Sequence, residues 1–264
     1  MAGIARIVHR ANRHSADRRI AGWRRAVVIG VLTLLPSVAR AQHLLLPMDD
    51  AQRNHLKAYG VAFLALKTGQ KAEWLLNYRG GAFLLPDAPD LRRRAALDGV
   101  SVEPLTDAGV ASARAEIAGG NMDAVVLERA PKIAIYRPAN QPPWDDAVTL
   151  ALQYAGIDFT SVWDDEVIKG DLAKYDWVHL HHEDFTGQFN KLYLAYRDAP
   201  WFVAQRDRDM LTARKFGYDN VPSLKKAVAE GIRGFVDKGG FIFAMCGATE
   251  SLDLAISAFS VDIA

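Results

Sequence analysis

Residues 236–250 read Val236-Asp237-Lys238-Gly239-Gly240-Phe241-Ile242-Phe243-Ala244-Met245-Cys246-Gly247-Ala248-Thr249-Glu250. The pattern predicts the end of a helix, a glycine turn, a buried strand, a sharp turn at Cys246 and a new helix. Small residues on both sides of Cys246 let a strand and a helix approach closely and push one side chain outward, as at a nucleophile elbow. A strand that leads into a helix in this way favours an α/β fold.

Cys246 is the only cysteine of the chain. A thiol at a helix N-terminus has its thiolate form favoured by the helix dipole, as a nucleophile requires. The N–H of Gly247 would then lie where an oxyanion develops. The alternative is a buried cysteine that packs as a small hydrophobic residue at the end of a core strand. The sequence leaves both interpretations open, and none of the 18 residues after Cys246 is a histidine that could serve as its base.

The first 41 residues differ from the rest of the chain. They contain eight arginines and one aspartate, an apolar run from Ala26 to Leu35, and Ala39-Arg40-Ala41 before Gln42. This layout predicts a signal peptide over 1–41 and an exported protein, periplasmic or extracellular. A buried N-terminal helix is the alternative. The apolar run is too short to span a bilayer, so we expect no stable membrane insertion after signal cleavage.

Composition narrows the kind of partner that the chain can have. Half of the 264 residues are hydrophobic, which is enough for one large or two smaller α/β units. Without residues 1–41 the net charge falls from +1 to −6, because 24 basic and 30 acidic residues remain. Such a chain lacks the basic footprint of a nucleic-acid-binding protein. We therefore expect a small-molecule ligand or substrate, no nucleic acid, and no cofactor, since no complete nucleotide-binding glycine motif is present.

From His43 onward, short apolar runs alternate with helical patterns, which predicts parallel sheets flanked by helices. The pattern restarts at Pro131, so we expect an N-terminal α/β domain over 42–130 and a second α/β domain over 131–264. The predicted strands cover 43–47, 73–77, 82–85, 101–105, 124–127, 132–136, 158–163, 175–181 and the run before Cys246. The predicted helices run from a cap at Asp49 or Asp50 to Gly69, and over 90–97, 107–117, 148–155, 191–216 and 223–237.

Polar residues gather just after several predicted strands, and we call these segments the rim loops. In open parallel sheets, ligands bind at the carboxyl ends of the strands, so the rim loops should share one edge. The candidate ligand-binding residues there are Asp49, Asp50, Asn77, Arg79, Gly80, Trp144, Asp145, Glu183 and Asp184. Arg79-Gly80-Gly81 in particular could present a guanidinium and backbone N–H groups to an anion. The alternative is that these residues only form turns and cap helices, and Asp164-Asp165-Glu166 is predicted to be a solvated loop.

His179-Leu180-His181-His182-Glu183-Asp184 concentrates imidazoles and carboxylates at the end of a predicted strand. His181 and His182 are candidate catalytic bases beside Cys246 and Gly247. A metal centre at His179, His181 and Glu183 and a purely structural, hydrogen-bonded role are the alternatives. The spacing matches no zinc signature, so we expect no metal.

Several motifs resemble an exported bacterial family commonly labelled asparagine synthetase B. They include His43–Asp50, Trp74–Gly81, Pro143–Leu152, Asp176–Gly187 and Phe243–Thr249, and the resemblance spans about 43–263. Members of that family continue beyond this C-terminus, so the resemblance implies a truncated chain with an exposed sheet edge and apolar surface. Glutamine-dependent asparagine synthetases begin Met-Cys and carry a Ser-Gly-Gly-x-Asp-Ser loop, whereas this chain begins Met1-Ala2 and has no such loop.

The region 132–264 also resembles the class I glutamine-amidotransferase-like fold, which is flavodoxin-like. The Gly-x-Cys-x-Gly motif of that fold corresponds to Ala244-Met245-Cys246-Gly247-Ala248, with alanine in both outer glycine positions. The resemblance implies a Cys-dependent amide hydrolase or amidotransferase in the full-length form. The His-x-Glu pair that follows the cysteine in that family is not in this chain. A non-catalytic periplasmic ligand-binding or scaffold protein is therefore the alternative.

Overall fold

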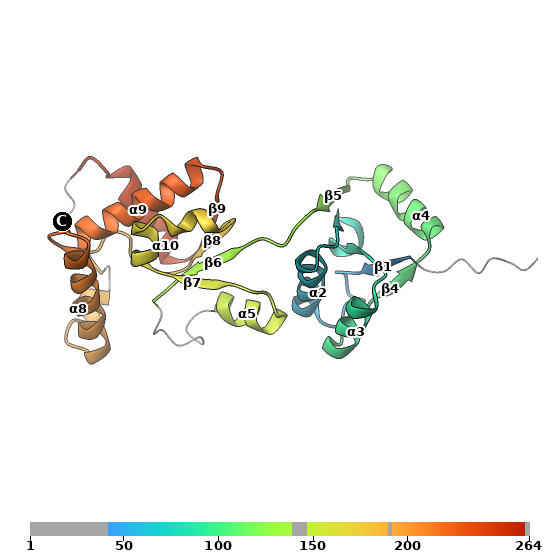
Figure 1. Cartoon of the computed structure of the whole chain (residues 1–264), viewed down its shortest axis with the longest axis horizontal. Helices are drawn as coiled ribbons and strands as arrows, with labels where there is room; N and C mark the ends of the chain where they lie inside the picture. The colour runs from blue at the N-terminus through green and yellow to red at the C-terminus, as the bar shows by residue number, and fades with distance from the viewer. Residues whose placement is uncertain (1–41, 139–146, 190–191, 262–264) are drawn as a thin grey trace, which may run out of the picture. The chain divides into compact units, whose positions relative to one another are not determined.

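The computed structural model of the chain describes residues 42–138, 147–189 and 192–261. Two β-sheets carry helices on their faces, one with strand order β4-β1-β3-β2-β5 and one with order β7-β6-β8-β9 (Figure 1). The chain is α/β with a parallel sheet flanked by helices, as the sequence predicts. The predicted signal peptide lies outside the described residues. Within the described residues, no helix combines the length and the apolar character needed to cross a bilayer.

The first sheet is antiparallel throughout, so the predicted parallel pairing is wrong here. The reason is the link between β2 and β3: residues 77–82 are too few for a parallel crossover, which needs a dozen or more residues. Its elements are β1 (His43–Leu46), α2 (His55–Lys67), β2 (Ala72–Leu76), β3 (Phe83–Pro86), α3 (Pro89–Asp98), β4 (Glu103–Leu105), α4 (Asp107–Ala118) and β5 (Asp123–Leu127), with the one-turn helix η1 (Tyr78–Gly80) between β2 and β3.

Strand β3 lies between β1 and β2, which gives β1 to β4 the split βαβ arrangement of ferredoxin-like folds. Because β1 and β2 both run antiparallel to β3, their carboxyl ends lie at the same edge of the sheet. Both faces of β1 are covered: Leu44 and Leu46 pack toward the core with α2 and α3, and Leu45 packs toward the core with α4. This explains why the strand is an unbroken apolar run.

Helix α2 begins later than the sequence predicts. Its N-cap is Asn54, whose Oδ1 accepts a hydrogen bond from the N–H of Lys57 at 3.2 Å, and not Asp49 or Asp50. The segment before it is fixed by the buried Gln52, which donates to the carbonyl of Pro47 at 2.9 Å. That anchored loop delays the helix by about one turn.

The second sheet is parallel in every pair, as predicted. Its strands are β6 (Ile133–Tyr136), β7 (Thr160–Val162), β8 (Trp177–Leu180) and β9 (Phe241–Ala244). The helices are α5 (Ala147–Ala155), α6 (Asp164–Ile168), η3 (Asp171–Lys174), α7 (Leu192–Tyr196), α8 (Pro200–Lys215), α9 (Val221–Asp237) and α10 (Gly247–Ser257). The long helix predicted over 191–216 is interrupted because Pro200 can start a helix but cannot continue one, so α8 begins there.

Helices lie on both faces of the parallel sheet. The apolar stripe of α9, with Leu224, Val228 and Ile232, packs with α10 on the face that carries Tyr136 and Leu180. The opposite face is covered by Leu152 of α5 and Phe63 of α2, over Ile133 and Ile135.

Strand β9 is the outermost strand of this sheet among the described residues. Phe241 and Phe243 point to the face away from α9 and are 58% and 48% exposed. The prediction of a fully buried strand is therefore wrong, since one face of β9 has no covering helix in the described part of the chain. Among the described residues, β9 therefore has an unpaired edge and an exposed apolar face.

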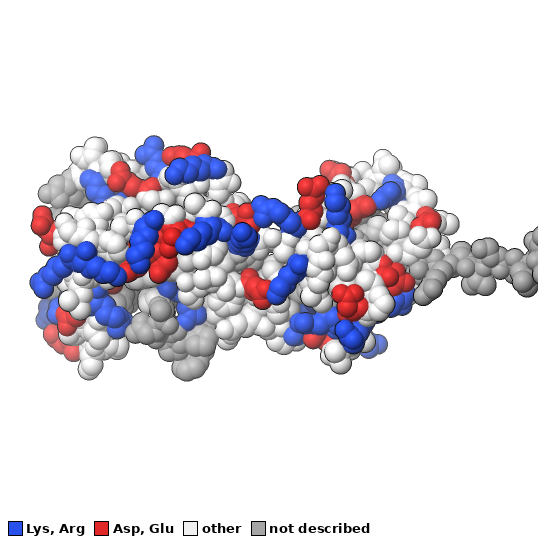
Figure 2. All heavy atoms as spheres, viewed as in Figure 1, with Lys and Arg blue, Asp and Glu red and all other residues white. Residues whose placement is uncertain are grey.

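Positive and negative side chains lie next to each other over the face shown in Figure 2. One ion pair joins Arg129 to Asp176 at 2.6 Å, and Asp176 also accepts a hydrogen bond from the N–H of Lys132 at 2.8 Å. The hydrogen bond from Arg129 lowers the pKa of Asp176 to about 2. These contacts tie the amino ends of β6 and β8 together, at the edge opposite to Cys246.

Candidate functional site

Cys246 occupies the turn between β9 and α10 and is the N-cap residue of α10. Its backbone angles are φ +49° and ψ −135°. This combination lies outside the regions that side chains with a Cβ normally adopt, including the left-handed helical region. The predicted strand, sharp turn and helix are thus present, and the turn holds Cys246 in a strained conformation.

The thiol of Cys246 is exposed, so the alternative of a buried structural cysteine is wrong. The turn is held by backbone contacts to the end of β8: Met245 N–H donates to the carbonyl of Leu180 at 2.9 Å, and Ala248 N–H donates to that of His181 at 3.2 Å. Within the described residues, the N–H of Gly247 donates no hydrogen bond. The turn therefore offers an accessible sulfur next to an available backbone donor.

His181 and His182 follow β8 directly, and β8 pairs in parallel with β9. The backbones of the two loops touch, because a Cβ on Gly247 would lie 3.4 Å from the carbonyl oxygen of His182. The Nδ1 atoms of the two histidines are 3.1 Å apart, which is a hydrogen bond that requires one ring to donate. The structure thus brings together the backbones of His181, His182, Cys246 and Gly247, the four residues that the sequence singled out for catalysis.

Glu183 is buried and braces this loop instead of lining an open rim. One carboxylate oxygen accepts the N–H of His181 at 2.9 Å, and its carbonyl accepts the hydroxyl of Ser251 in α10 at 2.8 Å. Burial raises the pKa of the Glu183 carboxyl. Asp184 accepts the N–H and the hydroxyl of Thr186 at 2.9 Å and 2.6 Å. Both acids shape the loop on which the histidines lie.

The described residues do not form a metal centre around His179, His181 and Glu183. They contain no group of three or more histidine, cysteine, aspartate or glutamate side chains arranged to hold a metal ion. His179 is fully buried, and its ring stacks on Phe243 with centroids 5.9 Å apart.

The rim residues of the first sheet form a separate group at the carboxyl ends of β1 and β2. Arg79 donates through Nε to Asp49 and through Nη2 to Glu103 at 2.9 Å. The hydrogen bond from Arg79 lowers the pKa of Asp49, and the two acids raise that of the guanidinium. Because Arg79 is engaged by both acids, the predicted presentation of this guanidinium to an anion is wrong.

The other candidate rim residues have varied positions. Asn77 donates to the carbonyl of Asn121 at 3.0 Å, Gly80 packs against the backbone of Met48, and Asp50 is exposed to solvent. Trp144 and Asp145 lie outside the described residues. The proposed rim therefore divides between two sheets instead of lining one edge, because its loops follow strands of two separate sheets.

Sequence reasoning missed a buried polar cluster at the carboxyl ends of β6 and β7. Lys225 of α9 donates to both carboxylate oxygens of Asp164, at 2.8 Å and 2.9 Å, and to the hydroxyl of Tyr136 at 3.1 Å. Tyr136 in turn donates to Asp164, and its burial raises its pKa well above the ordinary value. Asp164 is fully buried, so its predicted place in a solvated loop is wrong. Trp163 covers the cluster, with Lys225 Nζ 4.3 Å from the centre of its ring.

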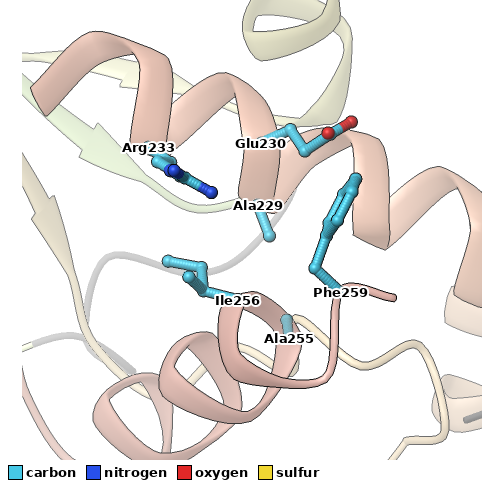
Figure 3. Close-up of a pocket in the computed structure, with 6 residues that line it drawn as sticks. All are labelled: Ala229, Glu230, Arg233, Ala255, Ile256 and Phe259. Atoms are coloured by element: carbon cyan, nitrogen blue, oxygen red, sulfur yellow. The ribbon is translucent and has the colours of Figure 1, made fainter. Parts of the chain in front are cut away.

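A shallow hollow lies between α9 and α10, away from these residues (Figure 3). Its volume is about 180 Å³, counting space open to solvent. The lining residues are Ala229, Glu230, Arg233, Ala255, Ile256 and Phe259. Ligand pockets usually enclose about 300 Å³ or more, so this hollow is small for a ligand, and it contains none of the candidate site residues.

The chain was also compared with protein-family models, with curated proteins and with solved structures. None of the three comparisons finds a match.

Proposed function

We propose that the chain is an exported Cys-dependent amide hydrolase or amidotransferase, with Cys246 as its nucleophile. The observation that supports this most is the strained backbone of Cys246 at the strand-to-helix turn, combined with an exposed thiol. Strained residues whose side chains do not stabilise the fold are concentrated at reactive sites. The motif around Cys246 and its resemblance to class I glutamine amidotransferases narrow the reaction to acyl transfer.

The parallel sheet is consistent with the same proposal. Its order β7-β6-β8-β9 corresponds to 2-1-3-4 in chain order within the sheet, as in flavodoxin-like folds. We assign residues 131–264 to this fold type, and the chain to the exported family labelled asparagine synthetase B. The signal peptide over 1–41 belongs to the same assignment.

The reaction follows from the atoms at the turn. In the proposed reaction, His181 or His182 takes the proton of the Cys246 thiol. The thiolate sulfur then attacks the amide carbonyl carbon, and the new oxyanion accepts a hydrogen bond from the N–H of Gly247. The C–N bond then breaks, and the leaving nitrogen takes a proton from the base, which is His181 or His182. Water hydrolyses the thioester, which releases the carboxylic acid and restores the thiol.

Alkylation of the purified chain tests the nucleophile, because one cysteine gives one possible adduct. We expect iodoacetamide to modify Cys246 at least ~10-fold faster than a simple thiol at neutral pH, measured by intact mass. Replacing His181 and His182 together by asparagine should reduce this rate, whereas His43→Asn in the first sheet should not. An alkylation rate equal to that of a simple thiol, in native and variant chains alike, would contradict the proposal.

The alternative is a non-catalytic periplasmic ligand-binding or scaffold protein. It is favoured by the hydrogen bond that joins the rings of His181 and His182, which engages one nitrogen of each candidate base. Incubation with small amides, followed by mass analysis for a thioester on Cys246, separates the two functions. Binding that persists in Cys246→Ser, with no thioester in the native chain, would establish the alternative.

A further inference from the structure

Helix α8 packs against the protein through a narrow stripe that has an acid in its centre. Its buried residues are Phe202, Asp209 and Ala213, and the rest of the described helix is half-buried or exposed. Spacings of seven and four residues place these three side chains on one helical face. Asp209 is only 4% exposed, although carboxylates are rarely buried without a partner.

Asp209 has charged neighbours on several elements of the domain. Lys225 of α9 is one, but it already donates two hydrogen bonds to Asp164 of α6. Asp164 and Asp184 repel a second negative charge, whereas Arg208 on α8 itself attracts it. The charge of Asp209 also raises the pKa of the Tyr136 hydroxyl on β6, as does the charge of Glu183 in the loop after β8.

The hydrogen bonds of this cluster leave Asp209 out. Within the described residues no group donates a hydrogen bond to its carboxylate, whose oxygens keep some contact with solvent, whereas Oδ2 of the neighbouring Asp184 is buried without a partner. An ionised Asp209 would therefore place a poorly solvated negative charge near Asp164 and Asp184, with no hydrogen bond from the described residues. A protonated Asp209 leaves Lys225 and Asp164 as a balanced pair.

We propose that α8 is a proton-dependent cover at the carboxyl edge of the parallel sheet, which packs tightly while Asp209 is protonated and loosens when Asp209 is ionised. The proton is the ligand, and Asp209 is its site. The proposal does not depend on any chemistry at Cys246.

Loosening of α8 would also affect the loop that carries His181 and His182. The ring of Phe202 packs edge-on against Phe189 at 5.4 Å, and Phe189 ends the segment that begins at His181. This ring contact is an apolar anchor between α8 and that segment. Release of α8 therefore removes a support of the loop beside the Cys246 turn.

The direction of the pH effect follows from where the proton binds more tightly. Desolvation by burial, reinforced by Asp164 and Asp184, raises the pKa of Asp209 from 3.8 to about 6. In the released helix the Asp209 carboxyl regains its ordinary pKa of 3.8. The packing of α8 is therefore strongest below pH 3.8 and weakens as the pH rises from there to about 6. Above about pH 6 the strength of packing no longer changes. Between about pH 5 and about pH 7.5, the equilibrium constant for opening should rise roughly tenfold.

Hydrogen–deuterium exchange of the full chain, followed over 200–215 by mass spectrometry, measures this opening. After correction for intrinsic exchange rates, we expect about tenfold faster exchange of α8 at about pH 7.5 than at about pH 5. Asp209→Asn should abolish the difference and protect α8 at the higher pH. Asp207→Asn is the matched control, since Asp207 lies on the exposed side of the same helix, 3.8 Å from Arg206, and it should keep the native pH dependence.

Two results would overturn the proposal. One is exchange of α8 that does not change with pH in the native chain, and the other is an Asp209→Asn chain with an unaltered profile. Failure of Asp209→Asn to fold would also count against it, because a neutral amide should be better tolerated at neutral pH than a buried charge. A direct NMR titration of the Asp209 carboxyl carbon gives an independent check: a midpoint near the ordinary value contradicts the proposal.

Discussion

Arg79 and Cys246 have nearly equal φ angles, +47° and +49°, yet the two regions use the unusual backbone differently. Arg79 lies at the edge of the antiparallel sheet, where its side chain is held by Asp49 and Glu103. Its carbonyl also accepts the N–H of Met48 at 2.8 Å. The guanidinium and the carbonyl of this residue therefore both contribute to the fold that imposes the strain.

At Cys246 the strain has no such compensation from the side chain. The thiol is exposed and makes no hydrogen bond to any described residue, and ψ of −135° departs from the left-handed region in which Arg79, with ψ of 43°, lies. The turn around Cys246 is held by backbone contacts to the end of β8 and by the hydroxyl of Thr249, which donates to the carbonyl of Cys246 at 2.6 Å. The difference teaches that a positive φ by itself does not mark a functional residue. The informative feature is a strained residue whose side chain is left available.

The two regions also differ in how exposed their cationic side chains are to solvent. The side chain of Arg79 is 31% exposed between its two acids, whereas that of Lys225 is 4% exposed and its partner Asp164 is inaccessible. When Arg79 is replaced, water can solvate part of the Asp49 and Glu103 carboxylates. When Lys225 is replaced, water cannot reach the carboxylate of Asp164. The buried pair should therefore matter far more to stability than the half-buried one.

Lys225→Met should give the largest effect in the molecule. Removal of the lysine leaves the carboxylate of Asp164 buried with only Tyr136 as a donor, which should lower the free energy of unfolding by about 3–5 kcal/mol. Arg79→Met should cost only about 1 kcal/mol, because its acids remain partly solvated. Urea denaturation of both variants, followed by circular dichroism, measures the two values.

The neighbouring Lys226 provides the control for the first variant. Its ammonium lies 4.5 Å from the centre of the Phe259 ring and has no buried acid partner among the described residues. Lys226→Met should change stability by less than about 1 kcal/mol. If Lys225→Met costs no more than Lys226→Met or Arg79→Met, the contrast between the two regions is wrong.

Gly80→Ala should be the next most damaging change, and it tests how tightly the antiparallel edge is built. A Cβ there would lie 2.5 Å from the backbone of Met48, at a residue with φ of +76°. Gly69 has a similar φ of +80° but open space around it. We expect a loss of about 3 kcal/mol for Gly80→Ala and about 1 kcal/mol for Gly69→Ala in thermal or urea unfolding. Equal losses would mean that the contact with Met48 adds nothing to the backbone penalty.

Apolar patterning predicts the positions of strands well, because burial of one or both faces constrains the residue types. The strands at Ile133–Tyr136 and His43–Leu46 lie within one residue of their predicted bounds. The same patterning carries no information about strand direction. The antiparallel first sheet could be inferred only from the length of the link 77–82, which is too short for a crossover.

The buried cluster of Tyr136, Asp164 and Lys225 could not be predicted from the sequence for a different reason. A charged residue looks solvated in a sequence unless its partner is known, and Asp164 is separated from Lys225 by 61 positions. Two weak signals were present. Lys225 adjoins the apolar stripe of α9 at Leu224, and Asp209 lies seven positions after Phe202, on one helical face. Such signals become decisive only when the fold shows which helical faces are covered.

The strain at Cys246 can be measured by comparing two substitutions that both remove the thiol. Cys246→Ala keeps a Cβ in the strained conformation, whereas glycine adopts φ of +49° and ψ of −135° readily. The strain at a non-glycine residue of this kind is about 1–3 kcal/mol, and the added flexibility of the unfolded glycine chain offsets part of it. Cys246→Gly should therefore be more stable than Cys246→Ala by about 1 kcal/mol in thermal unfolding.

The same pair at Glu250 is the control, because this exposed residue lies within α10, at the end of its first turn. There the order should reverse, with alanine more stable than glycine by up to about 1 kcal/mol, since glycine weakens a helix interior. A reversal between two positions four residues apart isolates the backbone conformation of Cys246 from general effects of glycine. If alanine is the more stable residue at both positions, the turn is not strained, and the structural distinction between Cys246 and Arg79 no longer holds.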